Sequence, residues 1–238
     1  MSERARTTRA PQGSGRASRA SGYGLLHPAV RQHLQSLLGR GSLDPVQAQA
    51  VEPVLDGEDV LVGAPFSGGR REAAAYPVFS RMLGEAWEGT SVICVGARAL
   101  DPWCVWLDRF ARRIGRRAQG LTSPSAPEMA PGGQGTDALD PDVLVLDATS
   151  LERLLDDVAP VLEGVRVVVL DDVESWRTAP SGGLLADALD ALELLVDRRV
   201  QRIGLTDTEA ASREALYWLS PGDREARIVA APPDPAVP

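Results

Sequence analysis

Apolar residues follow two alternating patterns along the chain. One pattern is a short unbroken run of Val, Ile and Leu, which is typical of a strand buried on both faces. The other is a longer stretch in which apolar residues recur at helical spacing. The expected strands lie at about residues 59–63, 90–95, 142–146, 165–170 and 200–206, and the expected helices at about residues 70–83, 101–114, 149–156, 183–196 and 210–218. Buried strands that alternate with helices predict an α/β fold, a three-layer domain with a mostly parallel sheet and helices on both faces.

Helix-start signals add detail to this pattern. One further helix is expected from about Pro28, and another from Asp44-Pro45, where Asp44 is the expected N-cap and Pro45 occupies the first helical position. A later start is indicated by Thr149 and Glu152, whose spacing fits a capping box. These signals place a helical segment ahead of the first strand.

Length and composition fit one domain with a tail at each end. Of the 238 residues, 1–22 are rich in Ser, Gly, Arg and Ala without periodicity, which predicts a disordered tail. The folded domain is expected over residues 23–230, with a surface loop rich in Pro, Gly and Ser at 122–141 and a Pro-rich tail at 231–238.

Charge is distributed unevenly along the chain. The net charge is −8, yet residues 1–22 carry five arginines against the single Glu3. The remaining acidic body argues against sequence-independent binding of nucleic acid over the whole surface, because such binding depends on neutralising phosphates. The basic tail, in contrast, is suited to an anionic partner, although a solvated arm has the same composition.

No membrane or secretory signal is evident. The sequence has no uncharged apolar run of about 18 residues and no apolar region in its Arg-rich start. The two cysteines, Cys94 and Cys104, form no Cys-x-x-Cys pattern. A reduced cytoplasmic protein without a membrane partner is therefore expected.

The stretch from Asp59 to Ala74 carries the clearest chemistry. It reads as a buried strand, a Gly-rich turn and a helix start, which is the layout of a phosphate-binding loop. Such a loop ends in Gly-Lys-Ser/Thr, where the Lys reaches the outer phosphates and the hydroxyl holds Mg²⁺. Here Arg70 and Arg71 occupy those two positions.

Several motifs follow one another in a recognisable order. Gln47 stands ahead of the loop, Arg98 follows the second strand, and Asp171-Asp172-Val173-Glu174 and Thr206-Asp207-Thr208 follow later strands. This series resembles the first RecA-like lobe of DEAD/DEAH-box superfamily 2 helicases, most closely the Lhr-like branch, over about residues 23–230. The resemblance implies a P-loop (RecA-like) domain that takes ATP or ADP.

The resemblance also implies a set of nucleotide-binding residues. They are Gln47, Ala64, Gly68, Gly69, Arg70 and Arg71. Gln47 matches the residue that recognises adenine in the family, although it also fits a capping box with Asp44. Arg71 replaces the metal-binding Thr with a cation, so Mg²⁺ is not expected.

The acidic motif departs from the family pattern as well. In the family its first Asp binds Mg²⁺ and the following Glu polarises the attacking water. Asp171 and Asp172 match these positions as vestigial catalytic residues, because Asp172 is one methylene shorter than the base that the reaction needs. Acidic residues after strands also cap helices, which is the alternative reading. Glu174, Thr206 and Thr208 match elements that couple the two lobes in the family.

Three arginines are candidates for nucleic-acid contact. Arg98 matches a family motif, while Arg109 and Arg113 belong to a basic run that ends the following helix. A solvated helix end, favoured by the helix dipole, gives the same pattern. DNA or RNA is therefore one expected partner.

Three functions are consistent with these residues. The first is a catalytically silent helicase-like lobe that serves as a nucleic-acid- or protein-binding scaffold, since phosphoryl transfer depends on the positions that have changed. The second is an ATP-dependent helicase subunit completed in trans by a partner chain that supplies a second lobe. The third is a metal-independent nucleotide sensor, in which Arg70 and Arg71 neutralise phosphates in place of Mg²⁺.

Overall fold

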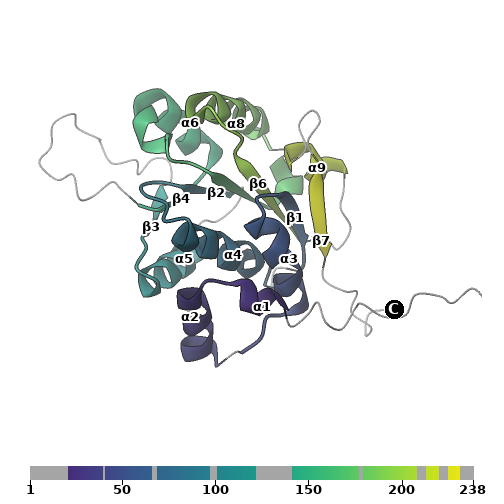
Figure 1. Cartoon of the computed structure of the whole chain (residues 1–238). Coiled ribbons are helices and arrows are strands. Elements are labelled where there is room, and N and C mark those ends of the chain that lie inside the picture. Colours follow the sequence, from purple (N-terminus) through teal and green to yellow (C-terminus); the bar gives the residue numbers. More distant parts are fainter. Residues whose placement is uncertain are drawn as a thin grey trace, which may run out of the picture.

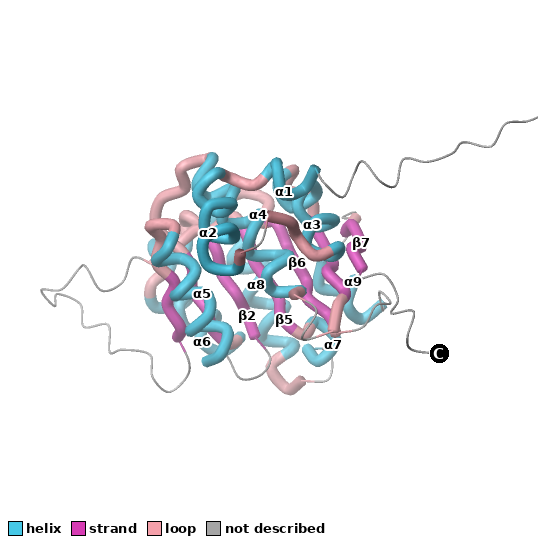
Figure 2. Tube along the Cα trace, turned by 90° about the horizontal axis from the view of Figure 1, so that it is seen from below, coloured by secondary structure: helices cyan, strands magenta, loops and turns pink. Residues whose placement is uncertain are grey.

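Seven parallel strands form the centre of the molecule, in the order β3-β4-β2-β5-β6-β1-β7 (Figures 1 and 2). The computed structural model describes residues 21–39, 41–65, 69–96, 101–121, 141–176, 179–207, 213–219 and 225–230. The strands are β1 (Asp59–Gly63), β2 (Val92–Gly96), β3 (Ala118–Leu121), β4 (Val143–Leu146), β5 (Val167–Asp171), β6 (Gln201–Thr206) and β7 (Ala226–Ala230). The predicted α/β fold with a parallel sheet is thus confirmed.

Helices cover both faces of the sheet (Figure 1). On one face lie α1 (Ser21–Leu25), α2 (Pro28–Leu38), α3 (Pro45–Leu55), α4 (Arg70–Gly84) and α5 (Asp101–Arg113). On the other lie α6 (Ala148–Asp157), the 3-10 helix η4 (Ala159–Leu162), α7 (Val173–Trp176), α8 (Gly182–Val196) and α9 (Arg213–Leu219). Within the described part of the chain, no helix is long and apolar enough to cross a membrane.

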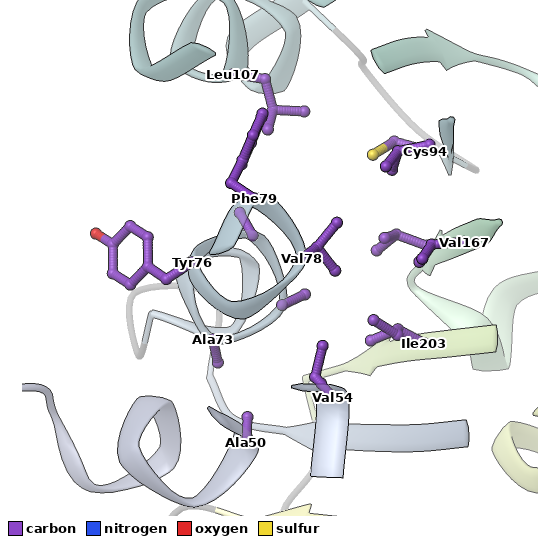
Figure 3. Close-up of a cluster of buried hydrophobic side chains, with 14 of the residues drawn as sticks. Ala50, Val54, Ala73, Tyr76, Val78, Phe79, Cys94, Leu107, Val167 and Ile203 are labelled. Carbon is purple, nitrogen blue, oxygen red and sulfur yellow. The ribbon is translucent and has the colours of Figure 1, made fainter. Parts of the chain in front are cut away.

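Strand periodicity divides the apolar core into two halves. Successive side chains of a strand point to opposite faces, so Val60 and Val62 of β1 pack on the side of α3 and α4, while Leu61 packs on the side of α9. Figure 3 shows the first half, in which Val78 and Phe79 of α4 lie among side chains from neighbouring elements. Because both faces are covered, the central strands β1, β2, β4 and β5 consist mainly of buried apolar residues.

The five apolar runs all form strands, but the sequence pattern missed the two edge strands. β3 reads Ala-Gln-Gly-Leu and β7 reads Ala-Arg-Ile-Val-Ala, and neither is a continuous apolar run. One predicted helix start was wrong. Asp147, not Thr149, caps α6, and its carboxylate accepts a hydrogen bond from the Ser150 N–H at 2.7 Å. The expected loop at 122–141 and the tail at 231–238 lie almost entirely outside the described residues.

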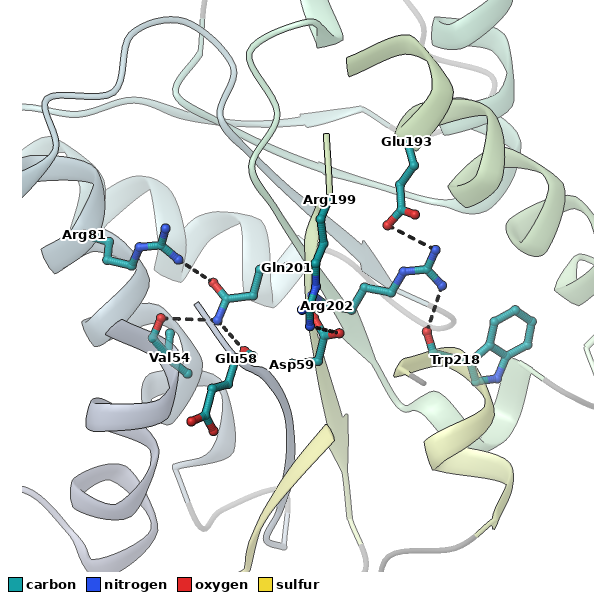
Figure 4. A network of polar contacts seen from close by, with 9 residues as sticks. All are labelled: Val54, Glu58, Asp59, Arg81, Glu193, Arg199, Gln201, Arg202 and Trp218. Atoms are coloured by element: carbon teal, nitrogen blue, oxygen red, sulfur yellow. Dashed lines mark hydrogen bonds and ion pairs between the residues drawn. The ribbon is translucent and has the colours of Figure 1, made fainter. Parts of the chain in front are cut away.

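A buried polar network fixes the amino ends of β1 and β6 (Figure 4). The fully buried carboxylate of Asp59 accepts hydrogen bonds from the Arg202 backbone N–H at 2.7 Å and from Arg199 Nη2 at 2.8 Å. The Gln201 amide donates to the carbonyl oxygens of Val54 and Glu58 at 3.2 and 2.6 Å. These bonds set the register of the two strands, and so determine which residues meet at their opposite, carboxyl ends.

Candidate functional site

Four central strands end side by side at the carboxyl edge of the sheet. The register places Gly63 of β1 opposite Thr206 of β6, and Asp171 of β5 between Leu205 of β6 and Gly96 of β2. The Ala64 N–H continues the pattern by donating to the Thr206 carbonyl oxygen at 3.1 Å. Open parallel sheets bind ligands at this edge, so the predicted residues Ala64, Asp171 and Thr206 lie where a site is expected.

Gly69 leads from the loop into α4 in a left-handed conformation, with φ of +75°. A Cβ atom at this position would lie 2.6 Å from Gln47 Nε2, so the absence of a side chain lets Gln47 approach the backbone. The centre of the predicted loop, Phe66 to Gly68, lies outside the described residues. Gly69 is therefore required both by its backbone conformation and by its close neighbour.

Gln47 links the start of α3 to this loop. Its Oε1 accepts a hydrogen bond from the Asp44 N–H at 3.2 Å, within a capping box at the start of α3. Its side-chain nitrogen faces Gly69. The capping role expected from the sequence is thus confirmed, while the residue is only 5% exposed. The predicted contact with adenine stays a prediction.

Arg70 and Arg71 both turn toward Asp171. Nη2 of Arg71 lies 2.5 Å from Asp171 Oδ2, and Nη2 of Arg70 lies 3.5 Å from Oδ1. Arg70 and Asp171 are buried and Arg71 is partly buried, with exposed side-chain fractions of 5%, 9% and 18%. Each carboxylate oxygen therefore faces a guanidinium in a poorly solvated environment, where charge-assisted hydrogen bonds are strong.

An aromatic ring holds Arg71 from another side. The guanidinium carbon lies 4.9 Å from the centre of the Trp103 ring, near the start of α5, which fits a cation–π contact. Beneath Arg71, Cys94 is buried, and this burial, with a smaller effect of neighbouring charges, raises the pKa of its thiol well above the ordinary value. The small apolar cavity between them, of about 10 Å³, leaves no room for a ligand.

The sequence did not predict that Trp103 contacts Arg71. Helical periodicity indicates that Trp103 faces the core, where it is 2% exposed. Nothing in the local pattern connects it to a loop more than 30 residues earlier in the chain. This contact arises from the packing of α5 beside α4, which a single sequence does not specify.

The rest of the acidic motif forms a short turn after β5. Asp172 has a left-handed backbone with φ of +58°, and its carbonyl accepts hydrogen bonds from the Ser175 N–H at 3.0 Å and hydroxyl at 2.8 Å. Glu174 accepts a hydrogen bond from the Thr206 hydroxyl, which joins the ends of β5 and β6. Thr208, predicted beside Thr206, lies outside the described residues.

The described residues do not fit a magnesium ion at this position. The carboxylate of Asp171 faces two cations, and no hydroxyl is present at position 71 to complete an oxygen ligand set. Among the described residues, no group of three or more Asp, Glu, His or Cys side chains is arranged to hold a metal. The guanidinium of Arg71 provides the positive charge that Asp171 requires.

Two of the three candidate nucleic-acid residues lie apart from the Arg71–Asp171 contact. Arg98 is outside the described residues. Arg109 and Arg113 are exposed on α5, which leaves the carboxyl edge at Asp101 and ends just before β3 at the amino edge. Arg116, from the same basic run, has a structural role. It donates hydrogen bonds to Asp142 Oδ1 at 2.8 Å and to the Trp87 carbonyl at 2.9 Å.

Comparison with known proteins gives consistent matches. The family described as DEAD/DEAH box helicase matches residues 44–214. The chain is 32% identical over 203 residues to "Lhr helicase/ probable uracil glycosylase" of Mycolicibacterium smegmatis, which covers 79% of the chain but only 13% of that protein. A solved structure of Mycobacterium smegmatis helicase Lhr bound to ssDNA and AMP-PNP is similar with a TM-score of 0.71 and 26% identity, over 89% of the chain and 28% of the Lhr chain. The DUF1998 helicase MrfA bound to DNA and AMPPNP shares the fold, with a TM-score of 0.71 and 15% identity. The match covers 86% of the present chain and 29% of the MrfA chain.

Proposed function

Because the chain belongs to the DEAD/DEAH box helicase family, we propose that it is a first RecA-like lobe that has lost ATP hydrolysis or retains very little of it and acts as a nucleic-acid- or protein-binding scaffold. The contact between Arg71 and Asp171, at 2.5 Å, carries this proposal. It joins the two residues whose counterparts hold magnesium in the family motifs.

The ion pair works against hydrolysis in two ways. A guanidinium on Asp171 repels an incoming divalent cation, and breaking the pair to admit the metal would leave one buried and one partly buried arginine facing Mg²⁺. Without the metal, the charge that develops on a transferring phosphoryl group loses its main stabilisation. Arg71 also cannot coordinate the ion, because a guanidinium has no lone pair to offer.

The position of the attacking water is affected independently. Asp172 stands where the family has the longer Glu, and a displacement of about 1 Å at a reacting group can cost on the order of a hundredfold in rate. Its left-handed backbone belongs to a turn held by Ser175. The altered metal site and the shorter base should therefore both lower the rate of ATP hydrolysis.

The test is a steady-state ATPase assay of the purified chain with Mg²⁺, with and without single-stranded DNA or RNA. We expect no turnover above that of a variant with Asp171→Ala, which serves as the blank. Robust magnesium-dependent hydrolysis that this substitution abolishes would refute the proposal. The matched comparison is the triple variant Arg70→Lys, Arg71→Thr and Asp172→Glu, which restores the family residues and should show higher turnover than the natural chain.

A metal-independent nucleotide sensor is the second candidate. It is favoured by the two arginines at the first residues of α4, since a helix amino end and guanidinium groups both attract phosphate. Binding would require Arg71 to exchange Asp171 for a phosphate oxygen. Calorimetry with ATP and ADP in EDTA tests this candidate: binding that Arg71→Gln weakens supports it, and no heat of binding in any buffer excludes it.

A further inference from the structure

The outer surface of α5, with α2 beside it, forms a face distinct from the Arg71–Asp171 contact. We call it the α2–α5 face and define it by Trp106, Arg109, Arg112 and Arg113 of α5 and His33 of α2. His33 and Phe110 meet edge to face with ring centres 4.7 Å apart, and both ribbon views place α2 next to α5 (Figures 1 and 2). The two helices therefore present one continuous surface.

This face is basic on an acidic protein. The chain has a net charge of −8, yet α2 and α5 together carry four arginines against two aspartates. Asp101 lies at the far end of α5, and Asp108 is paired with Arg112 at 2.8 Å. Within the described part of the chain, Arg109 and Arg113 form no ion pair, so their charges are available to a ligand.

The side chains of the face follow helical spacing. Trp106, Arg109 and Arg113 are three and four residues apart, so they project from the same side of α5, with a rise of about 6 Å between the two arginines. Trp106 is half-buried and lies nearly parallel to Phe110, at 4° with ring centres 5.7 Å apart. The indole is therefore held in place beside two exposed guanidinium groups.

From this arrangement we propose that the α2–α5 face binds single-stranded nucleic acid, with Arg109 and Arg113 on the phosphate backbone and Trp106 against a base. A positively charged surface with an aromatic ring is the combination that holds single strands without sequence preference. An acidic peptide would use the arginines but not the exposed part of the indole. Arg109 and Arg113 lie toward the amino edge of the sheet, so the strand would run away from the Arg71–Asp171 contact.

The inference does not depend on the loss of hydrolysis, and the two proposals can fail separately. The test is fluorescence anisotropy of a labelled oligothymidylate with the full chain in EDTA, over a series of salt concentrations. For the variant Arg109→Gln/Arg113→Gln we expect binding about tenfold weaker at low salt. The slope of log affinity against log salt should fall by about 1.4, since each lost phosphate contact on a single strand contributes about 0.7.

Two controls carry the same change in charge. Arg153→Gln/Arg166→Gln removes two exposed arginines outside the α2–α5 face, and Arg16→Gln/Arg19→Gln removes two from the basic tail. Both controls should retain most of the affinity of the natural chain. Thermal melting should change little in all three variants, because the substituted side chains outside the tail are exposed and the contact of Arg166 with the Trp87 ring, at 5.5 Å, is a weak surface interaction.

Photocrosslinking of a bromouracil-substituted strand, followed by mass spectrometry, should place adducts on the peptide that contains Trp106. The proposal is overturned if the natural chain does not bind the strand, or if Arg109→Gln/Arg113→Gln binds as tightly as the natural chain. It is also overturned if either control weakens binding as much, or if polyglutamate competes as well as the oligonucleotide. The last result would indicate an acidic protein partner.

Discussion

The contact between Arg71 and Asp171 leads to a quantitative prediction about folding stability. If the guanidinium replaces a metal ion in the folded protein, the pair must stabilise the lobe without any ligand. A double-mutant cycle with Arg71→Ala, Asp171→Ala and the double variant measures this coupling directly. The stability of each protein is measured by urea unfolding in EDTA, so that no divalent ion contributes.

The structure sets the expected magnitudes. Removing Asp171 leaves two largely buried arginines next to each other, and loss of one partner from a buried pair costs about 3–5 kcal/mol. Removing Arg71 should cost less, about 1.5–3 kcal/mol for a hydrogen bond to a charged group, because Arg70 remains 3.5 Å from the carboxylate. The coupling energy should fall at roughly 1–3 kcal/mol. For a domain of this size, the larger loss corresponds to a decrease in Tm of about 6–20 °C.

A matched surface pair provides the control. Arg112 and Asp108 approach to 2.8 Å, but their side chains are 71% and 33% exposed, so their coupling should stay below about 1 kcal/mol. If the cycle at Arg71 and Asp171 gives no more than the surface cycle, the guanidinium does not occupy the metal position in solution. In that case, an increase in Tm of the natural chain on adding Mg²⁺ would show that Asp171 is available to a metal.

Three further outcomes test other parts of the structure. Asp172→Gly should be more stable to urea than Asp172→Ala by about 1–2 kcal/mol. Both variants lose the same carboxylate, but only Gly accepts the φ of +58° without strain. Equal stabilities of the two variants would contradict this backbone conformation. Gly69→Ala should cost at least about 1 kcal/mol, because of its positive φ and the Cβ position 2.6 Å from Gln47 Nε2. Gly183→Ala, within α8 and with open space at its Cβ, should cause no loss of stability in the same assay, because alanine favours a helix more than glycine does. Burial and a neighbouring arginine lower the pKa of His33 below 6.5, so its contribution to stability is present above that pH and is lost as the pH falls. His33→Gln should therefore lose less stability than the natural chain on acidification, and parallel profiles would show that His33 does not titrate differently on folding.

Sequence patterns predicted the central part of the sheet because its strands are buried on both faces. Such strands are continuous apolar runs, and the order of runs and helices is sufficient to place residues 63, 171 and 206 at the same edge. The edge strands β3 and β7 are less apolar, since each has a neighbour on one side alone, and their pattern does not differ from that of a loop.

Side-chain partners were harder to predict than backbone elements. The sequence shows that Arg71 replaces a hydroxyl residue, but not that its guanidinium reaches a carboxylate 100 residues later in the chain. That contact depends on the length of the side chain, the start of α4 and the position of Trp103. The helix-cap choice at α6 shows the same limit on a smaller scale, because Asp147 and Thr149 are both acceptable N-caps in isolation.

An arginine at position 71 changes the charge balance at the end of β5. A carboxylate as buried as that of Asp171 requires a positive charge nearby, because transfer of an isolated ion from water costs several kcal/mol. A metal ion and a guanidinium both satisfy that requirement, and a guanidinium already bonded to the carboxylate makes the approach of a metal ion less favourable, since the two cations repel each other. Once position 71 carries an arginine, the folded chain has already neutralised Asp171 before any nucleotide arrives. Under the proposed function, a magnesium–nucleotide complex would have to displace the Arg71 guanidinium from Asp171, so the contact that we expect to stabilise the lobe would also oppose hydrolysis.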